Sequence, residues 1–221
     1  MNALRDQIEA LRVPAKALAR RAHFPVGTRV QRTKDALKAR SRVKVKHLIL
    51  KENARALVAQ GWPALDERVW AIVPGDFVFG ELVPAVMEAH GAPEHLWLST
   101  LSLSAENVEM LREVLRVCPV SLLVSNYFKS TSAETFGLLE SLRGVPGWSL
   151  AVARIHTKLM LFDYPGCPVV LEGSANLRSN NSYEQVALHQ DAPLFFFYRS
   201  WMQELWTLAD AEGGSALIAR P

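Results

Sequence analysis

The residues best suited to catalysis lie in the C-terminal third of the chain, between positions 156 and 184. His156 and Lys158 are two residues apart in a run that alternates as a β-strand does, so we expect both side chains on one face. An imidazole beside a fixed positive charge can attack a phosphate ester whose anion the lysine holds. Gly173, Ser174 and Asn176 end the next predicted strand and can offer backbone N–H groups and an amide to the same spot. This cluster is typical of phosphate-ester chemistry.

A carboxylate on an apolar strand face gives a second indication. In the strand predicted over 183–190, Glu184 shares its face with Val186 and Leu188. A carboxylate there is costly unless a partner meets it. His156 is the expected partner, because a Glu–His hydrogen bond fixes the imidazole tautomer and stabilises its positive charge. The alternative is an edge strand on which Glu184 is solvated.

Together these residues resemble the signature of the phospholipase D superfamily, His-x-Lys-x4-Asp followed by Gly-Ser-x-Asn. Four residues separate Lys158 from Asp163, and nine more precede Gly173. The resemblance covers about residues 68–200, and it implies the fold of that superfamily, a mixed β-sheet flanked by helices in an α/β sandwich.

The resemblance also assigns roles to the motif residues. It implies catalytic roles for His156, Lys158, Asp163 and Glu184, and phosphate-binding roles for Ser174 and Asn176 fit the same site. Asp163 precedes a Tyr-Pro-Gly turn, and the role implied for it is more structural than chemical. Arg178 has two interpretations, a phosphate ligand or a surface residue. Thr100, Asn126 and Lys129 lie near predicted strand ends, but no motif supports them.

Superfamily members that break phosphodiesters need two His-Lys motifs, and this sequence contains one. In the implied reaction one histidine attacks phosphorus to give a phosphohistidine, and the other protonates the leaving oxygen and then activates water. The resemblance therefore implies a homodimer with one motif from each subunit facing the other. It implies no cofactor and no metal, because the lysines supply the positive charge. The histidines that lack a lysine two residues later are His23, His47, His90, His95 and His189.

The net charge of +3 is unevenly distributed. Residues 1–60 contain fifteen Lys or Arg and four Asp or Glu, whereas residues 61–221 contain ten and eighteen. A basic segment joined to an acidic body indicates contact with a polyanion, most often nucleic acid. A solvated helical extension or a disordered tail is the alternative. The basic residues that cluster here are Arg29, Arg32, Lys34, Lys38, Arg40, Arg42, Lys44 and Lys46.

The pattern of apolar residues and turn formers predicts two parts, a basic N-terminal helical extension over 1–60 and a catalytic domain over 61–221. In the second part strands and helices alternate, and Ser104 is the expected N-cap of a helix. We expect helices over 3–22, 45–60, 77–90, 104–117, 132–143 and 193–211, and strands over 69–73, 96–101, 120–124, 148–153, 155–162, 169–171 and 183–189.

A nuclease-like phosphodiesterase acting on DNA or RNA is the function that these features favour. The alternatives are a lipid phosphodiesterase or phosphatidyltransferase, and a non-catalytic nucleic-acid-binding module with a vestigial site. No apolar run is long enough to span a bilayer, no secretory signal is present and the two cysteines are isolated. We therefore expect a cytoplasmic protein without stable membrane association.

Overall fold

The computed structural model of the chain describes residues 44–49, 54–65, 67–73, 79–178 and 182–211. The contacts divide the chain after Arg42, and every described element belongs to the unit Val43–Pro221. The elements, in chain order, are β1 (Lys44–Ile49), α4 (Ala54–Gly61), β2 (Glu67–Val73), the short 3₁₀ helix η2 (Phe79–Glu81), α5 (Leu82–His90), β3 (His95–Thr100), α6 (Ala105–Val114), β4 (Val120–Ser125), α7 (Asn126–Thr131), α8 (Ala133–Glu140), β5 (Trp148–Ala153), β6 (Leu159–Asp163), β7 (Val169–Gly173), β8 (Glu184–His189) and α9 (Ala192–Ala211).

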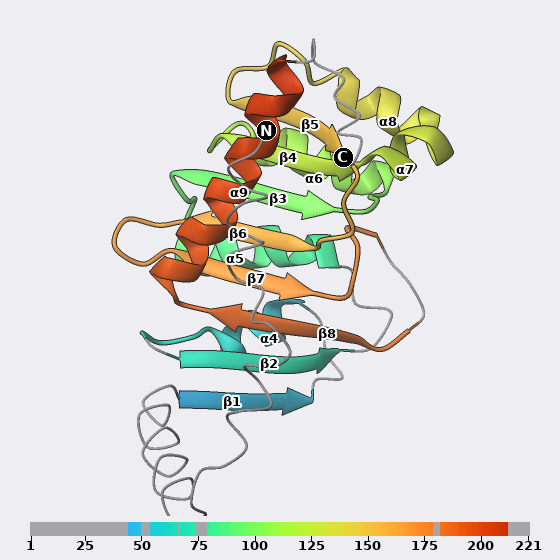
Figure 1. The fold of residues 1–221 in the computed structure, drawn as a ribbon. Helices are drawn as coiled ribbons and strands as arrows, with labels where there is room; N and C mark the ends of the chain where they lie inside the picture. The colour runs from blue at the N-terminus through green and yellow to red at the C-terminus, as the bar shows by residue number, and fades with distance from the viewer. Residues whose placement is uncertain (1–43, 50–53, 66, 74–78, 179–181, 212–221) are drawn as a thin grey trace, which may run out of the picture. The chain divides into compact units, whose positions relative to one another are not determined.

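The strands form one mixed sheet in the order β1-β2-β8-β7-β6-β3-β4-β5 (Figure 1). β1 pairs parallel with β2, and β3, β4 and β5 pair parallel with one another. Between these two groups β8, β7 and β6 form antiparallel pairs with their neighbours. The predicted mixed sheet flanked by helices is confirmed.

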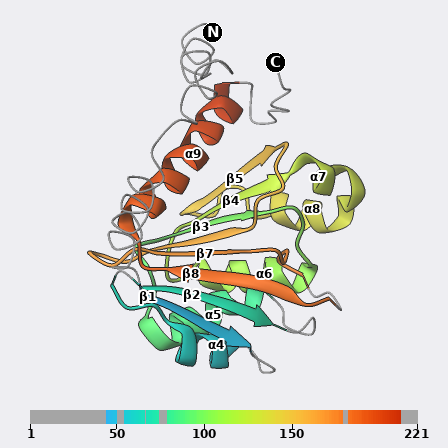
Figure 2. The same ribbon diagram turned by 60° about the horizontal axis from the view of Figure 1, so that its bottom comes forward.

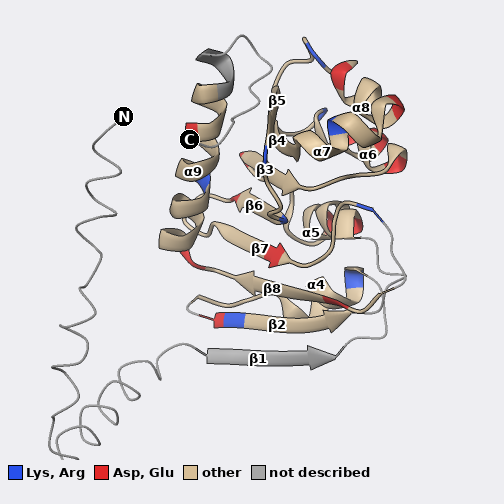
Figure 3. Cartoon of the chain, turned by 45° about the vertical axis from the view of Figure 1, so that its right-hand side comes forward, with Lys and Arg blue, Asp and Glu red and all other residues tan. Residues whose placement is uncertain are grey.

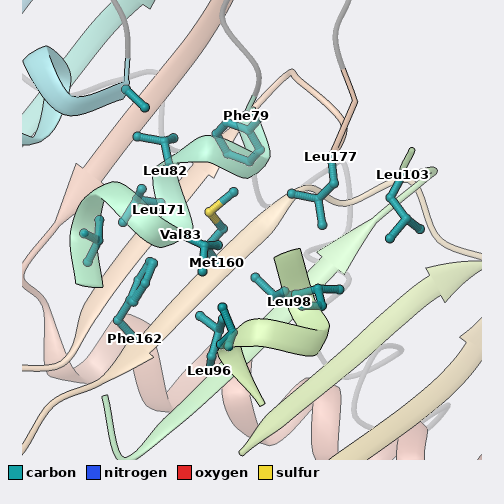
Figure 4. Close-up of a cluster of buried hydrophobic side chains, with 14 of the residues drawn as sticks. Phe79, Leu82, Val83, Leu96, Leu98, Leu103, Met160, Phe162, Leu171 and Leu177 are labelled. Atoms are coloured by element: carbon teal, nitrogen blue, oxygen red, sulfur yellow. The ribbon is translucent and has the colours of Figure 1, made fainter. Parts of the chain in front are cut away.

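Helices cover both faces of the sheet (Figure 2). On one face α4, α5, α6 and α8 pack over the larger apolar cluster, which includes Leu98, Met160 and Phe162 at its centre (Figure 4). On the other face α9 packs on β4–β7 through Phe195 and Met202. Burial of these side chains supplies the main stabilisation of the fold.

Local signals place several of the elements. Every residue of β4 is buried, as its apolar run and its place between β3 and β5 require. Ser104 caps α6 by accepting a hydrogen bond from the backbone N–H of Asn107. α5 ends at Gly91, whose φ of 82° suits a glycine. The predicted cap and helix end are both confirmed.

Two predicted elements are wrong in their bounds. The helix predicted over 45–60 is a strand over Lys44–Ile49 followed by α4, because β1 pairs in register with β2 and so gains backbone hydrogen bonds from the sheet. The strand predicted over 155–162 begins only at Leu159. The predicted division at residue 60 falls within α4, and residues 1–43 lie outside the described part.

Among the described residues no helix has the length and apolar character needed to cross a bilayer. Cys118 is buried, Cys167 is half-buried, and both thiols are free. Burial raises the pKa of the Cys118 thiol to about 11, so this thiol is protonated at neutral pH.

Candidate active site

The motif segments meet at one edge of the sheet, which we call the site edge. At the site edge β2, β3, β4, β5 and β7 end, and β6 and β8 begin. The register shows this directly, since Leu159 of β6 lies between Ser99 of β3 and Glu172 of β7. Gly173 in turn pairs with Val186 of β8. Segments distant in sequence therefore converge here.

His156 and Lys158 lie together at the site edge, as predicted. Lys158 Nζ is 3.1 Å from His156 Nδ1 and 3.0 Å from the carbonyl oxygen of His156. Only 7% of Lys158 is exposed, whereas His156 is exposed to solvent. The contact comes from the lysine side chain folding back along a connection, and not from strand alternation. It places a cation directly beside an accessible imidazole.

Two opposing influences act on the charged form of Lys158. Burial lowers the pKa of the Lys158 ammonium, and the negative charge of Glu184 acts in the opposite direction. The carboxylate thus favours the protonated lysine, the form that binds an anion. This is an electrostatic role for Glu184 that the sequence did not predict.

Glu184 is buried on the core face of β8, at 9% exposure. It accepts a short hydrogen bond from the Ser174 hydroxyl, which itself accepts one from the Gln185 backbone N–H at 3.0 Å. The Ser174 N–H donates to the Gln185 carbonyl oxygen at 3.1 Å. These hydrogen bonds of Ser174 join the end of β7 to β8 and fix the position of the Glu184 carboxylate. The hydrogen bond between Glu184 and His156 stays a prediction.

Gly173 leaves no room for a side chain. A Cβ atom at this position would lie 2.7 Å from the Gln185 carbonyl oxygen and 3.3 Å from Cε2 of Phe79. The glycine of the motif is thus explained by the close approach of β8 and η2. It allows Ser174 to reach Glu184.

The remaining motif residues are placed differently. Asn176 has a buried side-chain oxygen with no hydrogen-bond partner among the described groups, so this oxygen is not used in a structural bond. Arg178 is exposed at the end of the described loop. Asp163 lies at the opposite end of β6 from Lys158 and pairs with Arg199 of α9 at 3.4 Å. The structure does not bring Asp163 to the site edge; the aspartate ties α9 to the sheet.

Two residues at the end of β3 hold the motif segments, and sequence reasoning gave neither of them this role. The Ser99 hydroxyl is hydrogen-bonded to the Thr157 hydroxyl, between His156 and Lys158. Thr100 Oγ1 accepts from the Leu177 N–H at 3.2 Å and donates to the Ser102 carbonyl oxygen at 2.8 Å. The sequence feature that could have identified Ser99 and Thr100 is a pair of hydroxyl side chains at the end of an apolar strand.

Acidic residues gather on two helices. Figure 3 shows Asp and Glu on α6 and α8, whereas Lys and Arg are spread over helices, strands and connections. In the described part of the chain, no three His, Cys, Asp or Glu side chains are grouped as metal ligands would be. The basic residues Arg29, Arg32, Lys34, Lys38, Arg40 and Arg42 lie outside the described residues, and the side chains of Lys44 and Lys46 do as well.

Comparison with solved structures identifies the fold. Nuc from Salmonella typhimurium, a phospholipase D family member, is similar with a TM-score of 0.50 and 16% identity; the match covers 63% of this chain and 93% of Nuc. The fold is that of the phospholipase D superfamily.

Two further solved structures are similar to this chain at lower TM-scores. NucT from Helicobacter pylori has a TM-score of 0.47 and 15% identity, over 64% of this chain and 97% of NucT. Phosphatidylserine synthase from Haemophilus influenzae has a TM-score of 0.41 and 14% identity, over 63% of this chain and 38% of the synthase. Neither a protein-family model nor a curated protein sequence matches this chain.

The phospholipase D fold agrees with the motif found in the sequence. The His-x-Lys motif precedes the first residue of β6, and the Gly-Ser-x-Asn motif runs from the last residue of β7 into the loop that follows. Each motif thus lies where two antiparallel neighbours present their ends together. One copy of the site edge supplies one histidine and one lysine of this kind.

Proposed function

We propose that the protein is a phosphodiesterase that cleaves nucleic acid through a phosphohistidine intermediate. The observation that carries the proposal is the contact between Lys158 Nζ and the His156 ring. A buried ammonium beside an exposed imidazole can bind a phosphate anion and present a nucleophile to it. Ser174, Glu184 and Asn176 lie on the adjoining strand ends, where they support this pair.

The arrangement of Lys158 suggests how the nucleophile is released. While its ammonium donates to His156 Nδ1, the ring proton of the neutral imidazole is on Nε2. When Lys158 turns to a bound phosphate, Nδ1 can take the proton and Nε2 becomes free to attack. Substrate binding and activation of His156 are then the same event.

The proposed reaction has two displacements at phosphorus. The Nε2 lone pair forms a bond to phosphorus, the bond to the leaving oxygen breaks, and a second imidazole donates its proton to that oxygen. Water then attacks phosphorus and gives a proton to the same imidazole, and the N–P bond breaks to restore His156. Lys158 neutralises the non-bridging oxygens in both steps, so the proposal needs no divalent metal for that purpose.

We propose that the second imidazole is the same histidine of a second copy of the chain. Three other histidines, His90, His95 and His189, support this assignment, because each lies away from the site edge. His95 pairs with Asp163 at the opposite end of β3, and His189 ends β8 at the opposite side. His90 stacks on Trp62, with ring centroids 3.9 Å apart. A two-fold axis through the site edge would bring two motif histidines together.

Nucleic acid is the proposed substrate because of charge. Residues 29–46 contain eight Lys or Arg, and the site edge carries the exposed Arg154 and Arg178. Positive charge of this density holds a phosphate backbone and makes binding salt-dependent.

The decisive experiment is cleavage of plasmid and single-stranded DNA, and of RNA, in the presence of EDTA. We expect cleavage by the wild-type chain and its loss in His156→Ala and Lys158→Met, with an acid-labile phosphoryl adduct on the wild-type chain alone. Glu204→Gln, on the exposed side of α9, is the matched surface control. Turnover of phospholipid vesicles with nucleic acid left intact would replace this proposal by a lipid phosphodiesterase.

The shared site has its own test, in which wild-type chains are mixed with His156→Ala chains and allowed to exchange subunits. If two histidines from two copies are needed, activity falls as the square of the wild-type fraction. A linear fall would show that each chain works alone.

A further inference from the structure

The four tyrosines of the chain fall into two kinds. Tyr164 and Tyr198 are partly buried and their hydroxyls donate, at 2.8 Å to the Gly91 carbonyl oxygen and at 2.7 Å to Glu172 Oε2. Tyr127 and Tyr183 are 60% and 78% exposed. An aromatic side chain with this exposure does not gain the free energy that burial of its ring would supply. The exposed positions of Tyr127 and Tyr183 therefore need an explanation.

Both exposed tyrosines lie at the site edge. Tyr127 is the second residue of α7, which follows β4 directly, and Tyr183 immediately precedes β8. In the sheet β4 and β8 each lie two strands from β6, on opposite sides of it. With strands about 4.8 Å apart, each tyrosine is displaced by about 10 Å along the edge from the start of β6, where Lys158 lies.

Two connections at the site edge carry exposed positive charge. Arg154 follows the last residue of β5, and Arg178 follows the loop that contains Asn176. Neither tyrosine is part of the larger or the smaller buried apolar cluster of the fold. The site edge therefore has an aromatic ring on each side of the phosphate-binding residues, with Arg178 following a loop that lies between the rings and Arg154 one strand beyond Tyr127.

We infer that the chain acts on single-stranded nucleic acid, whose bases stack on Tyr127 and Tyr183 while the phosphate between them is held at Lys158. This inference rests on the proposed function and adds the substrate class. Unpaired bases can turn out and stack on aromatic side chains, each with a sizeable gain in affinity, whereas the bases of a duplex are already stacked on one another. Arg178 accompanies the backbone between the two bases, and Arg154 meets it beyond the base on Tyr127.

The test measures binding apart from cleavage, at one fixed salt concentration, in a His156→Ala background. The probes are a fluorescently labelled oligothymidylate and the same strand annealed to oligoadenylate, followed by anisotropy. We expect Tyr127→Ala and Tyr183→Ala each to weaken single-strand binding about fivefold or more and duplex binding less than twofold. Tyr127→Phe and Tyr183→Phe should keep most of the single-strand affinity. Phe197→Ala, which removes an equally exposed ring from α9, is the control and should change neither constant.

The outcomes separate this inference from the proposed function. Equal loss on both probes, or no loss on the single strand, overturns the inference even if the wild-type chain cleaves nucleic acid. A change in the mass of the assembly with the tyrosine variants also overturns it and assigns these rings to a subunit interface. Selective single-strand binding by a wild-type chain that cleaves no nucleic acid would overturn the proposed function. It would still support the inferred binding of single strands by Tyr127 and Tyr183.

Discussion

The hydroxyls of Ser99 and Thr157 are hydrogen-bonded to each other, so the end of β3 holds the connection that carries His156 and Lys158. Strand β6 begins only at Leu159, and before it the backbone of the connection accepts one hydrogen bond from β7, from the Gly173 N–H to the Lys158 carbonyl oxygen at 3.2 Å. The position of the nucleophile thus depends on a side-chain bond to a neighbouring strand.

We expect Ser99→Ala and Thr157→Val each to reduce kcat/KM about tenfold and to lower the free energy of unfolding by about 1 kcal/mol. Because both remove the same bond, the double variant should lose little more than either single variant. Hydrolysis of bis(p-nitrophenyl) phosphate and urea unfolding measure the two quantities. Fully additive losses would show that the two hydroxyls act independently.

The pH profile should report the state of Lys158. Burial lowers the pKa of this ammonium from 10.5 and Glu184 raises it, so phosphate binding is lost on the alkaline side at a pH below 10.5. Glu184→Gln removes the raising influence, and the alkaline fall in kcat/KM should therefore move to lower pH. Glu134→Gln on α8 is exposed and should leave the profile in place. An unmoved profile in Glu184→Gln would contradict the coupling.

A second carboxylate should govern stability in acid. Glu172 accepts hydrogen bonds from Tyr198 at 2.7 Å and is 3.1 Å from His189 Nε2, and the hydrogen bond with His189 is the main cause that lowers its pKa from 4.5. A depressed carboxylate stabilises the fold above pH 4.5, and this contribution is lost as the pH falls through the folded pKa. Glu172→Gln should therefore lower Tm by a few degrees at pH 7, with the difference shrinking between pH 4.5 and 3.

Thermal scans of both chains across this pH range measure the effect. The Tyr198 hydroxyl should report the same contact, because burial and the hydrogen bond to Glu172 raise its pKa to about 12. A difference in Tm that stays constant down to pH 3 would show that the variant acts through packing alone.

Two glycines should respond to alanine with opposite signs. Gly173→Ala places a methyl group 2.7 Å from a backbone oxygen that cannot move freely, so we expect a loss of about 1–3 kcal/mol. Gly137 lies within α8 and an added Cβ there meets nothing within 4 Å, so Gly137→Ala should gain about 0.5–1 kcal/mol. Equilibrium unfolding in urea measures both; equal effects would show that the close approach at Gly173 is not what constrains it.

The sequence predicted which residues meet at the site better than it predicted the local structure that brings them together. His156 and Lys158 are neighbours, but the chain from 154 to 158 is a connection and not a strand. The sheet order explains this, because the chain leaves β5 and must pass β4 and β3 to reach β6. About 14 Å must be covered in six residue steps, which run across the strands and not along one, so residues 154–158 form no strand. Strand order cannot be read from local alternation.

Packing decided the other differences. The final helix was expected from its apolar content, and α9 runs over Ala192–Ala211, yet Phe195 is buried whereas Phe196 and Phe197 are exposed. A run of three aromatic residues does not show which of them faces the sheet. Likewise Glu184 was expected on the apolar face and is found there, but its hydroxyl partner is Ser174, the residue that follows β7. Only the register of β7 and β8 shows that these two residues meet.

The position of β8 in the sheet determines when the fold can be completed during synthesis. It is the strand that joins the β1–β2 pair to the remaining strands, and its first residue is Glu184. During synthesis, β1 and β2 emerge early but cannot be incorporated into the sheet until residues 184–189 have left the ribosome. Glu184 therefore emerges together with the strand that completes the sheet. A nascent chain whose sheet is incomplete also lacks the complete site.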